Sequence, residues 1–168
     1  MTDTEVWVNG KSAGPIHRGS FYRFTFDVTS LLKFGEPNLL EVTVSKESSN
    51  ASVNRAERLG DYWNFGGIFR PVFLQALPAR FIDWTAIDAR ADGDFSVAVN
   101  LGGIAASAGR VSAQIIDLKG ASVGQPFSAD ISANQDVVKL QTNIRAPRLW
   151  TAETPNLYFV RLTLTPQS

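Results

Sequence analysis

The sequence predicts an all-β fold made of two β-sandwich modules, and three observations support this prediction. Apolar and polar residues alternate with a period of two along most of the chain, and no long helical period is visible. Clusters of Gly, Asp, Ser and Asn separate the alternating runs. Hydrophobic residues make up 44% of the 168 residues and charged residues 19%, so the chain can bury a core.

The first module is predicted to span residues 1–78. Asn9-Gly10 follows the strand pattern "EVWV", and this dipeptide readily adopts the positive φ angles of a hairpin turn. The segment "TSLLKFG" indicates one helical turn, which Thr29 or Ser30 caps and Gly35 ends.

The rest of the first module is predicted to be three strands and a loop. The strands cover residues 21–28, 38–45 and 68–77, and Pro71 restricts the last of them to a sheet edge or a bulge. Residues 46–60 are polar and poor in strand formers, which predicts a long loop. Four or five strands are too few for a closed jelly roll of eight, so we expect a partial jelly roll.

The second module is predicted to span residues 79–168, with Pro78 at the boundary. Its strands are short and regularly spaced, over residues 81–89, 95–101, 110–118, 137–144 and 157–165. About 90 residues in this pattern are typical of an immunoglobulin-like sandwich.

Charge and composition exclude several classes of function. Lys plus Arg and Asp plus Glu are equal at 16 each, so the chain lacks the basic surface that a nucleic-acid partner requires. Like charges do not cluster, and the apolar runs fall far short of the ~20 residues that span a membrane, so no membrane partner is expected. The absence of cysteine excludes disulfides and thiolate metal sites. The opening "MTDTEVWVNG" lacks a signal-peptide pattern and enters a strand at once, which suggests a chain that begins partway through a larger domain.

Local carboxylates offer one candidate for catalysis. Hydrolysis of a glycosidic bond needs two carboxyl groups about 5–9.5 Å apart, and Glu57 and Asp61 in "RAERLGD" are the best local pair. The favoured alternative is that Glu57 is solvated in a loop and Asp61 caps a turn. His17 has no Ser or Asp pattern that suggests a triad, so we expect a loop or surface residue. Trp150 is expected to be a packing residue.

The segment "GDYWNFGGIFRPVFL" contains the strongest candidate binding site. Tyr62, Trp63 and Phe65 could form an apolar platform for a sugar ring, with Asp61 accepting hydrogen bonds from hydroxyl groups or holding a cation. The alternative is structural: Trp63, Phe65 and Phe69 plug the end of the sandwich. Composition alone favours this structural alternative.

Four segments, in order, resemble the non-catalytic N-terminal region of family 2 glycoside hydrolases, the β-galactosidase and β-glucuronidase group. "VWVNGKSAG" resembles a strand and turn late in the family's sugar-binding jelly roll, and "FTFDVTSLLKFGEPNLLEVTV" is similar to its F-x-F-D-(V/I)-T…L…G-x-N-x-L-x-V-x-V pattern. "GDYWNFGGIFRPVFL" resembles the D-x-W…GGI-x-R-x-V-x-L segment that closes this domain. "RLWTAETPNLYFVRLTL" is similar to the end of the family's immunoglobulin-like domain.

The resemblance implies a fragment that scaffolds an absent catalytic barrel and adds to the rim of its sugar site. The barrel carries the catalytic glutamates of the family, so we expect no catalytic residue in this chain and no hydrolysis by it. Asp61 matches a position that contacts the sugar and a sodium ion in some β-galactosidases, and Trp63 matches the same motif. The parent would be a retaining β-glycosidase with a β-galactoside-like substrate, and no cofactor is implied beyond sodium or magnesium in the full-length enzyme. Pro71 and residues 64–66 depart from well-known β-galactosidases, which leaves the sugar open.

Two further function classes stay open from the sequence. One is a free-standing carbohydrate-binding or adhesion module, and the other is a purely structural interaction domain. A truncated jelly roll exposes sheet edges, so we expect a homo-oligomer through residues 5–8 or 21–28. A bacterial periplasmic or extracellular location is the working expectation.

Overall fold

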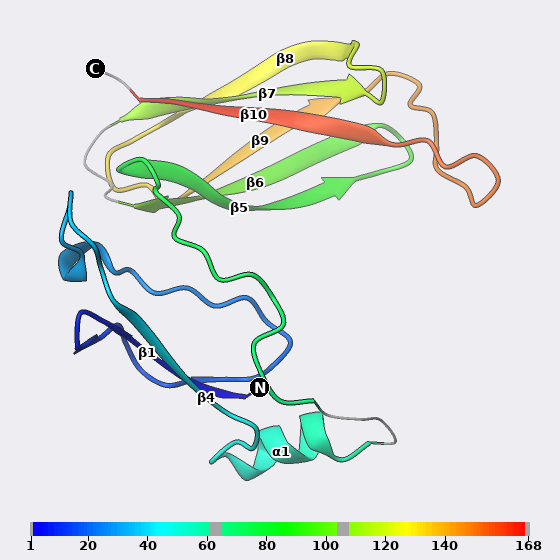
Figure 1. The fold of residues 1–168 in the computed structure, drawn as a ribbon. Helices are drawn as coiled ribbons and strands as arrows, with labels where there is room; N and C mark the ends of the chain where they lie inside the picture. Colours follow the sequence, from blue (N-terminus) through cyan, green and yellow to red (C-terminus); the bar gives the residue numbers. More distant parts are fainter. Residues whose placement is uncertain (1, 61–64, 104–107, 167–168) are drawn as a thin grey trace. The chain divides into compact units, whose positions relative to one another are not determined.

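The structure, a computed structural model, describes residues 2–60, 65–103 and 108–166. The described residues form ten strands, one α-helix and one 3-10 helix, which confirms the predicted all-β class (Figure 1). The chain divides into two compact units, Met1–Leu74 and Gln75–Ser168. Within the described part of the chain, helices are too short and too polar to cross a membrane.

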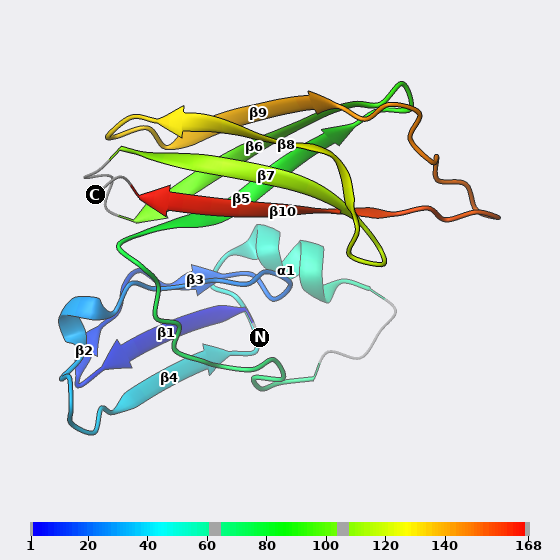
Figure 2. The ribbon, with the colours of Figure 1, turned by 90° about the horizontal axis from the view of Figure 1, so that it is seen from above.

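The first unit contains one antiparallel sheet in which β1 (Asp3–Val8) is central. β4 (Leu40–Ser45) pairs with the whole length of β1, while β2 (Lys11–Ser12) and β3 (His17–Arg18) pair with its other side (Figure 2). The predicted hairpin is confirmed, because the β1–β2 turn contains Asn9 at φ 53° and Gly10 at φ 76°.

The Asn9 side chain joins this turn to the segment that follows. Its Nδ2 donates to the Leu31 carbonyl at 2.9 Å, and its Oδ1 accepts from the Leu39 amide at 3.0 Å. Leu31 ends the 3-10 helix η1 (Thr29–Leu31), which confirms the predicted helical turn. Its predicted cap is wrong: Asp27 Oδ1, rather than Thr29 or Ser30, accepts the Thr29 amide at 2.9 Å.

The predicted loop over residues 46–60 is wrong, because this segment contains the helix α1 (Ala51–Arg58). Asn50 is its N-cap, since its Oδ1 accepts from the Ser52 and Val53 amides at 2.9 and 3.4 Å. The triplet Asn50-Ala51-Ser52 therefore starts a helix. The helix is mostly polar and spans only eight residues, so it has no long apolar stripe from which sequence reasoning could recognise it.

The predicted strands over residues 21–28 and 68–77 are also wrong, because neither segment pairs with another strand in the described structure. Their alternation is present, but strand formation requires a hydrogen-bonded partner. The predicted exposed edge at residues 5–8 is likewise wrong, since β1 has neighbours on both sides. Self-association stays a prediction, and the longest strand of this unit with a single described partner is β4.

The second unit is a sandwich of two three-stranded antiparallel sheets (Figure 1). One sheet has the order β5 (Arg80–Ala89), β6 (Asp94–Gly103), β9 (Val137–Asn143), and the other has the order β10 (Tyr158–Pro166), β7 (Gly109–Asp117), β8 (Ser122–Ile131). All five strands predicted for this module are present. Its core consists of alternate residues from both sheets, namely Phe95, Val97, Val99, Val111, Ala113, Ile115, Ile131, Val138 and Leu140.

Strand β8 is not predicted from the sequence, because Gly124 and Pro126 interrupt it. The structure places β8 at a sheet edge, where proline is tolerated. The β7–β8 register shifts between Ala113 and Ile115, and Gly124 takes a φ of 71° beside this irregularity. The Gln114 side chain donates to the Val123 and Gly124 carbonyls there, at 3.3 and 3.4 Å.

Candidate functional site

The predicted site residues Asp61 and Trp63, together with Tyr62, lie outside the described residues. Two described segments flank these residues in the sequence. Helix α1 precedes residues 61–64, and residues 65–74 follow them.

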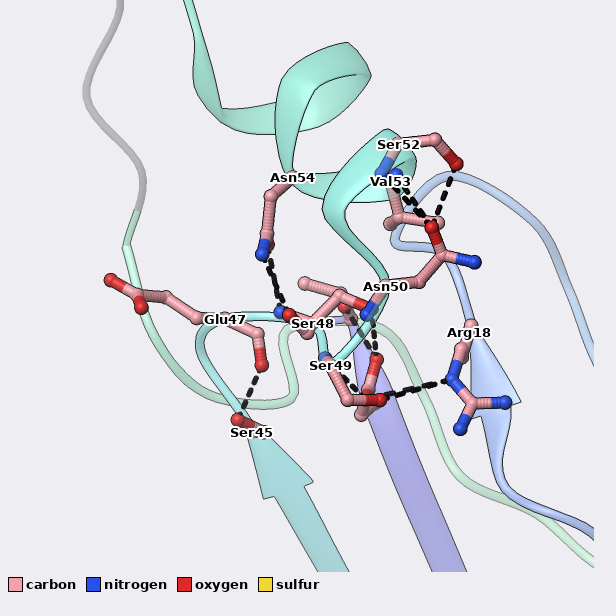
Figure 3. A network of polar contacts seen from close by, with 11 residues as sticks. Arg18, Ser45, Glu47, Ser48, Ser49, Asn50, Ser52, Val53 and Asn54 are labelled. Carbon is pink, nitrogen blue, oxygen red and sulfur yellow. Dashed lines mark hydrogen bonds and ion pairs between the residues drawn. The ribbon is translucent and has the colours of Figure 1, made fainter.

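A polar network built around Asp3 fixes the segment that leads into α1. The Asp3 carboxylate accepts from the Ser48 hydroxyl, from the Ser49 amide at 2.9 Å and hydroxyl at 2.8 Å, and from the Thr2 hydroxyl at 2.9 Å. Arg18 Nε lies 3.7 Å from the same carboxylate. Figure 3 shows Ser48, Ser49 and Arg18 gathered at the N-terminal end of the helix.

Two opposing effects act on the pKa of Asp3. Burial, which leaves its side chain 13% exposed, acts to raise the pKa. The hydrogen bonds from Ser48, Ser49 and Thr2 prevail, and they hold the pKa well below the usual range of an aspartate. Asp3 is thus a fixed anion that binds the start of β1 to the start of α1.

The same network continues into the first turn of the helix. Asn54 Oδ1 accepts the Ser48 amide at 2.8 Å, and Asn54 Nδ2 donates to the Ser48 carbonyl at 2.6 Å. Ser48 therefore contacts both Asp3 and Asn54, so the loop before α1 is held from two sides (Figure 3).

Glu57 anchors the last turn of α1, four positions before Asp61. The predicted solvated state of Glu57 is wrong, because the residue is 8% exposed. Its Oε1 accepts the Ser20 amide at 3.0 Å, and its Oε2 accepts the Ser20 hydroxyl at 2.7 Å. This carboxylate is engaged in holding the turn after β3, and Asp61, its candidate catalytic partner, lies outside the described residues.

His17 also belongs to this support and not to an exposed loop, which corrects its predicted placement. It lies in β3, its ring stacks on Phe24 with centroids 3.9 Å apart, and its Nε2 is 3.1 Å from the Gly19 carbonyl. Phe24 in turn meets Phe26 edge to face at 5.8 Å.

The segment after residues 61–64 presents aromatic rings to solvent. Phe65 is 84% exposed and Phe69 is 74% exposed, so the packing role predicted for these two rings is wrong in the described structure. Arg70 lies over the Phe69 ring at 5.1 Å, and Arg23 lies over the Phe73 ring at 5.8 Å. Cationic and aromatic groups thus lie together in the segment that follows residues 61–64 in the sequence.

Trp150 is the other predicted packing residue that the structure exposes, at 62%. It forms an isolated antiparallel bridge with Pro155 in a turn that Asn156 fastens by donating to the Leu149 carbonyl at 2.9 Å. The exposed indole is a feature of the surface of the second unit, and sequence reasoning missed it because tryptophan usually packs.

The described residues contain no group of three or more His, Cys, Asp or Glu side chains that could hold a metal ion. What the described arrangement does is fix both ends of α1, through Asp3 at its start and Glu57 at its end.

We predict that Glu57→Gln destabilises the first unit by about 1–2 kcal/mol. The amide can accept from only one of the two Ser20 donors and turns an N–H group toward the other. Hydrogen exchange of residues 17–20 and 51–58 should accelerate. Glu47→Gln is the matched control, because Glu47 is exposed on the loop that precedes α1 and should leave exchange unchanged. Equal exchange in the two variants would contradict this role of Glu57.

Comparisons with known proteins cover the whole described chain. Residues 79–168 match the sequence profile of "Glycosyl hydrolases family 2", and residues 2–78 match "Glycosyl hydrolases family 2, sugar binding domain". A β-galactosidase from Thermoanaerobacter pseudethanolicus is 29% identical over 173 residues, which cover 100% of this chain and 23% of the relative. A β-galactosidase from Halalkalibacterium halodurans is 32% identical over 166 residues, or 95% of this chain and 15% of the relative.

A solved structure also matches nearly the whole chain. A β-glucuronidase from Bacteroides uniformis superposes with a TM-score of 0.79 at 25% identity, over 97% of this chain and 21% of that one. The chain thus spans about a fifth of the length of the proteins it matches.

Proposed function

The chain belongs to glycosyl hydrolases family 2, and we propose that it supports residues 61–64 at the rim of the sugar site of a β-galactosidase-like enzyme. The observation that carries this proposal is the pair of adjoining profile matches over residues 2–168. We assign residues 1–78 to the sugar-binding domain and residues 79–168 to the immunoglobulin-like domain. Carbohydrate is the partner that the sugar-binding domain and the glycosidase relatives support.

The proposed mechanism is one of positioning. Asp3 and Glu57 hold the two ends of α1, so the chain enters residues 61–64 from a fixed direction. Asp61 would accept hydrogen bonds from sugar hydroxyls and, with ligands from elsewhere in the enzyme, bind sodium or magnesium. Trp63 would offer an aromatic face to the sugar ring.

The chain by itself is proposed to be inactive toward glycosides. Both carboxylate oxygens of Glu57 accept hydrogen bonds from Ser20. The parent enzyme would use a carboxyl pair from its catalytic domain in a retaining reaction. Incubation of the chain with nitrophenyl β-galactoside and nitrophenyl β-glucuronide should release no nitrophenol. Release that Asp61→Ala abolishes would overturn this point.

The positioning role is tested in the complete enzyme that contains this chain. Asp61→Ala should lower kcat/KM for nitrophenyl β-galactoside by about tenfold or more and weaken its dependence on sodium. Asp83→Ala is the control, because Asp83 is an exposed aspartate of the second unit and should leave both quantities unchanged. An Asp61→Ala enzyme with full activity and unchanged sodium dependence would refute the assignment of Asp61.

A further inference from the structure

One face of the first unit's sheet combines a single indole with polar side chains. Along β1, Thr4 and Val8 are buried, so they face inward, and Glu5 and Trp7 alternate onto the opposite face. The β1–β4 register places Glu41 directly across from Trp7 and Thr43 directly across from Glu5. Strand β2 places Ser12 beside Trp7 on its other side.

This face is hollowed at the indole. Trp7, Gly10, Glu41 and Thr43 line a hollow of about 320 Å³. The hollow is shallow and largely open, so it suits a small ligand that lies on the indole, such as one sugar ring. A Cβ atom built on Gly10 would meet nothing within 4 Å, so the turn leaves the hollow open at its rim. Trp7 itself is half-buried, so neighbouring residues hold the indole in place while part of it remains exposed.

The chemistry of the hollow matches a pyranose ring. The flat indole suits the C–H face of the ring, and the Glu41 carboxylate and the Thr43 hydroxyl can bind ring hydroxyls. Glu5 and Glu41 take part in none of the ion pairs found among the described residues, so both carboxylates can accept from a ligand. The same two negative charges disfavour a sugar that carries its own carboxylate.

The composition also favours a sugar over a protein partner. Protein interfaces have apolar cores that are depleted in Glu and Ser, whereas here two glutamates, a threonine and a serine surround one tryptophan. The matched sugar-binding domain spans residues 2–78 and so includes the entire hollow. These observations select carbohydrate as the occupant.

We propose that the hollow at Trp7, Glu41 and Thr43 binds an uncharged pyranoside and rejects uronides. The proposal rests on the proposed function for its class of ligand. This site is separate from Asp61 and Trp63 in the sequence, and it needs no residue from outside this chain.

The test uses saturation-transfer NMR of the chain with methyl β-galactopyranoside and, separately, methyl β-glucuronide. The uncharged glycoside should bind with a Kd on the order of 1 mM, and the glucuronide should bind several-fold more weakly. Trp7→Ala should weaken binding of the uncharged glycoside by about tenfold or more. Trp84→Ala is the control, because Trp84 is 57% exposed on the second unit and should leave binding unchanged.

A second variant keeps the result decisive if Trp7→Ala unfolds. Glu41→Gln removes one charge from an exposed strand position, and it should raise the affinity for methyl β-glucuronide toward that for the galactoside. No binding of the uncharged glycoside by the wild-type chain, or equal binding of both sugars by wild type and Glu41→Gln, would overturn the proposal. The proposed rim function is judged separately, by the effect of Asp61→Ala on turnover.

Discussion

Asp3→Asn is expected to destabilise the first unit by about 2–4 kcal/mol. The Asp3 carboxylate accepts four hydrogen bonds from three residues, and its side chain is 13% exposed. An asparagine at this position keeps one acceptor oxygen and turns an amide N–H group toward donors that also carry hydrogen. Either the Ser49 amide loses its acceptor, or the Ser48 and Thr2 hydroxyls lose theirs, so the network can no longer keep all four bonds.

Hydrogen exchange followed by mass spectrometry measures this effect without requiring a single two-state transition of both units. Exchange should accelerate in β1 and α1 and stay unchanged in the second unit. Asp27→Asn is the matched control, because Asp27 is exposed, its carboxylate accepts from the amide and the side chain of Thr29, and an asparagine oxygen can replace the acceptor of the amide. Acceleration of equal size in the two variants would show that the network contributes no special stability.

The same carboxylate makes the stability of the first unit depend on pH. The pKa of Asp3 is lower in the folded than in the unfolded chain, so its contribution is complete above the ordinary value near 4. The contribution is lost progressively as the pH falls below 4 toward the depressed folded value. Wild type should therefore lose more stability than Asp3→Asn between pH 5 and pH 2. The additional loss should equal the contribution of the Asp3 carboxylate, which the variant lacks at every pH. Parallel losses would contradict the depressed pKa.

Leu140→Ala is expected to cost the second unit about 2–5 kcal/mol. Leu140 is 3% exposed on β9, within the core cluster that both sheets build, so its truncation leaves a cavity between them.

Leu118→Ala makes the same chemical change at a position that is 58% exposed, and it should cost about 0.5 kcal/mol or less. Denaturant unfolding followed by exchange of the second unit's amides compares the two variants. Similar losses at Leu140 and Leu118 would show that the described core does not carry the stability of this unit.

The sequence predicted those parts of the fold in which local chemistry decides the structure. The dipeptide Asn9-Gly10 encodes its own turn, and the strands of the second unit alternate strongly enough to be found one by one. By contrast, Gly124 and Pro126 concealed β8, because proline can occupy an edge strand whose edge position is known only after folding. Residues 21–28 show the opposite failure, since they alternate like a strand but pair with no strand among the residues that the structure describes.

The candidate site could be predicted in part. Asp61 and Trp63 were reached through the resemblance of one short segment, and they remain proposals. The bonds between Glu57 and Ser20 were not predicted, because nothing in the sequence places Ser20 beside Glu57. The role of Asp3 was missed altogether, since its partners Ser48 and Ser49 lie 45 and 46 positions away and no periodic pattern links them.

Because of this long separation in sequence, Asp3 stabilises a segment that lies far from the start of the chain. A protease that cut between Asp3 and Thr4 would remove none of the buried hydrophobic side chains of the described unit and would leave most of β1 in place. It would nevertheless release the start of α1, because the carboxylate that fastens Ser48 and Ser49 would leave with the clipped peptide. In such a trimmed protein, loss of order would begin at the helix that leads into residue 61 and not at the cut.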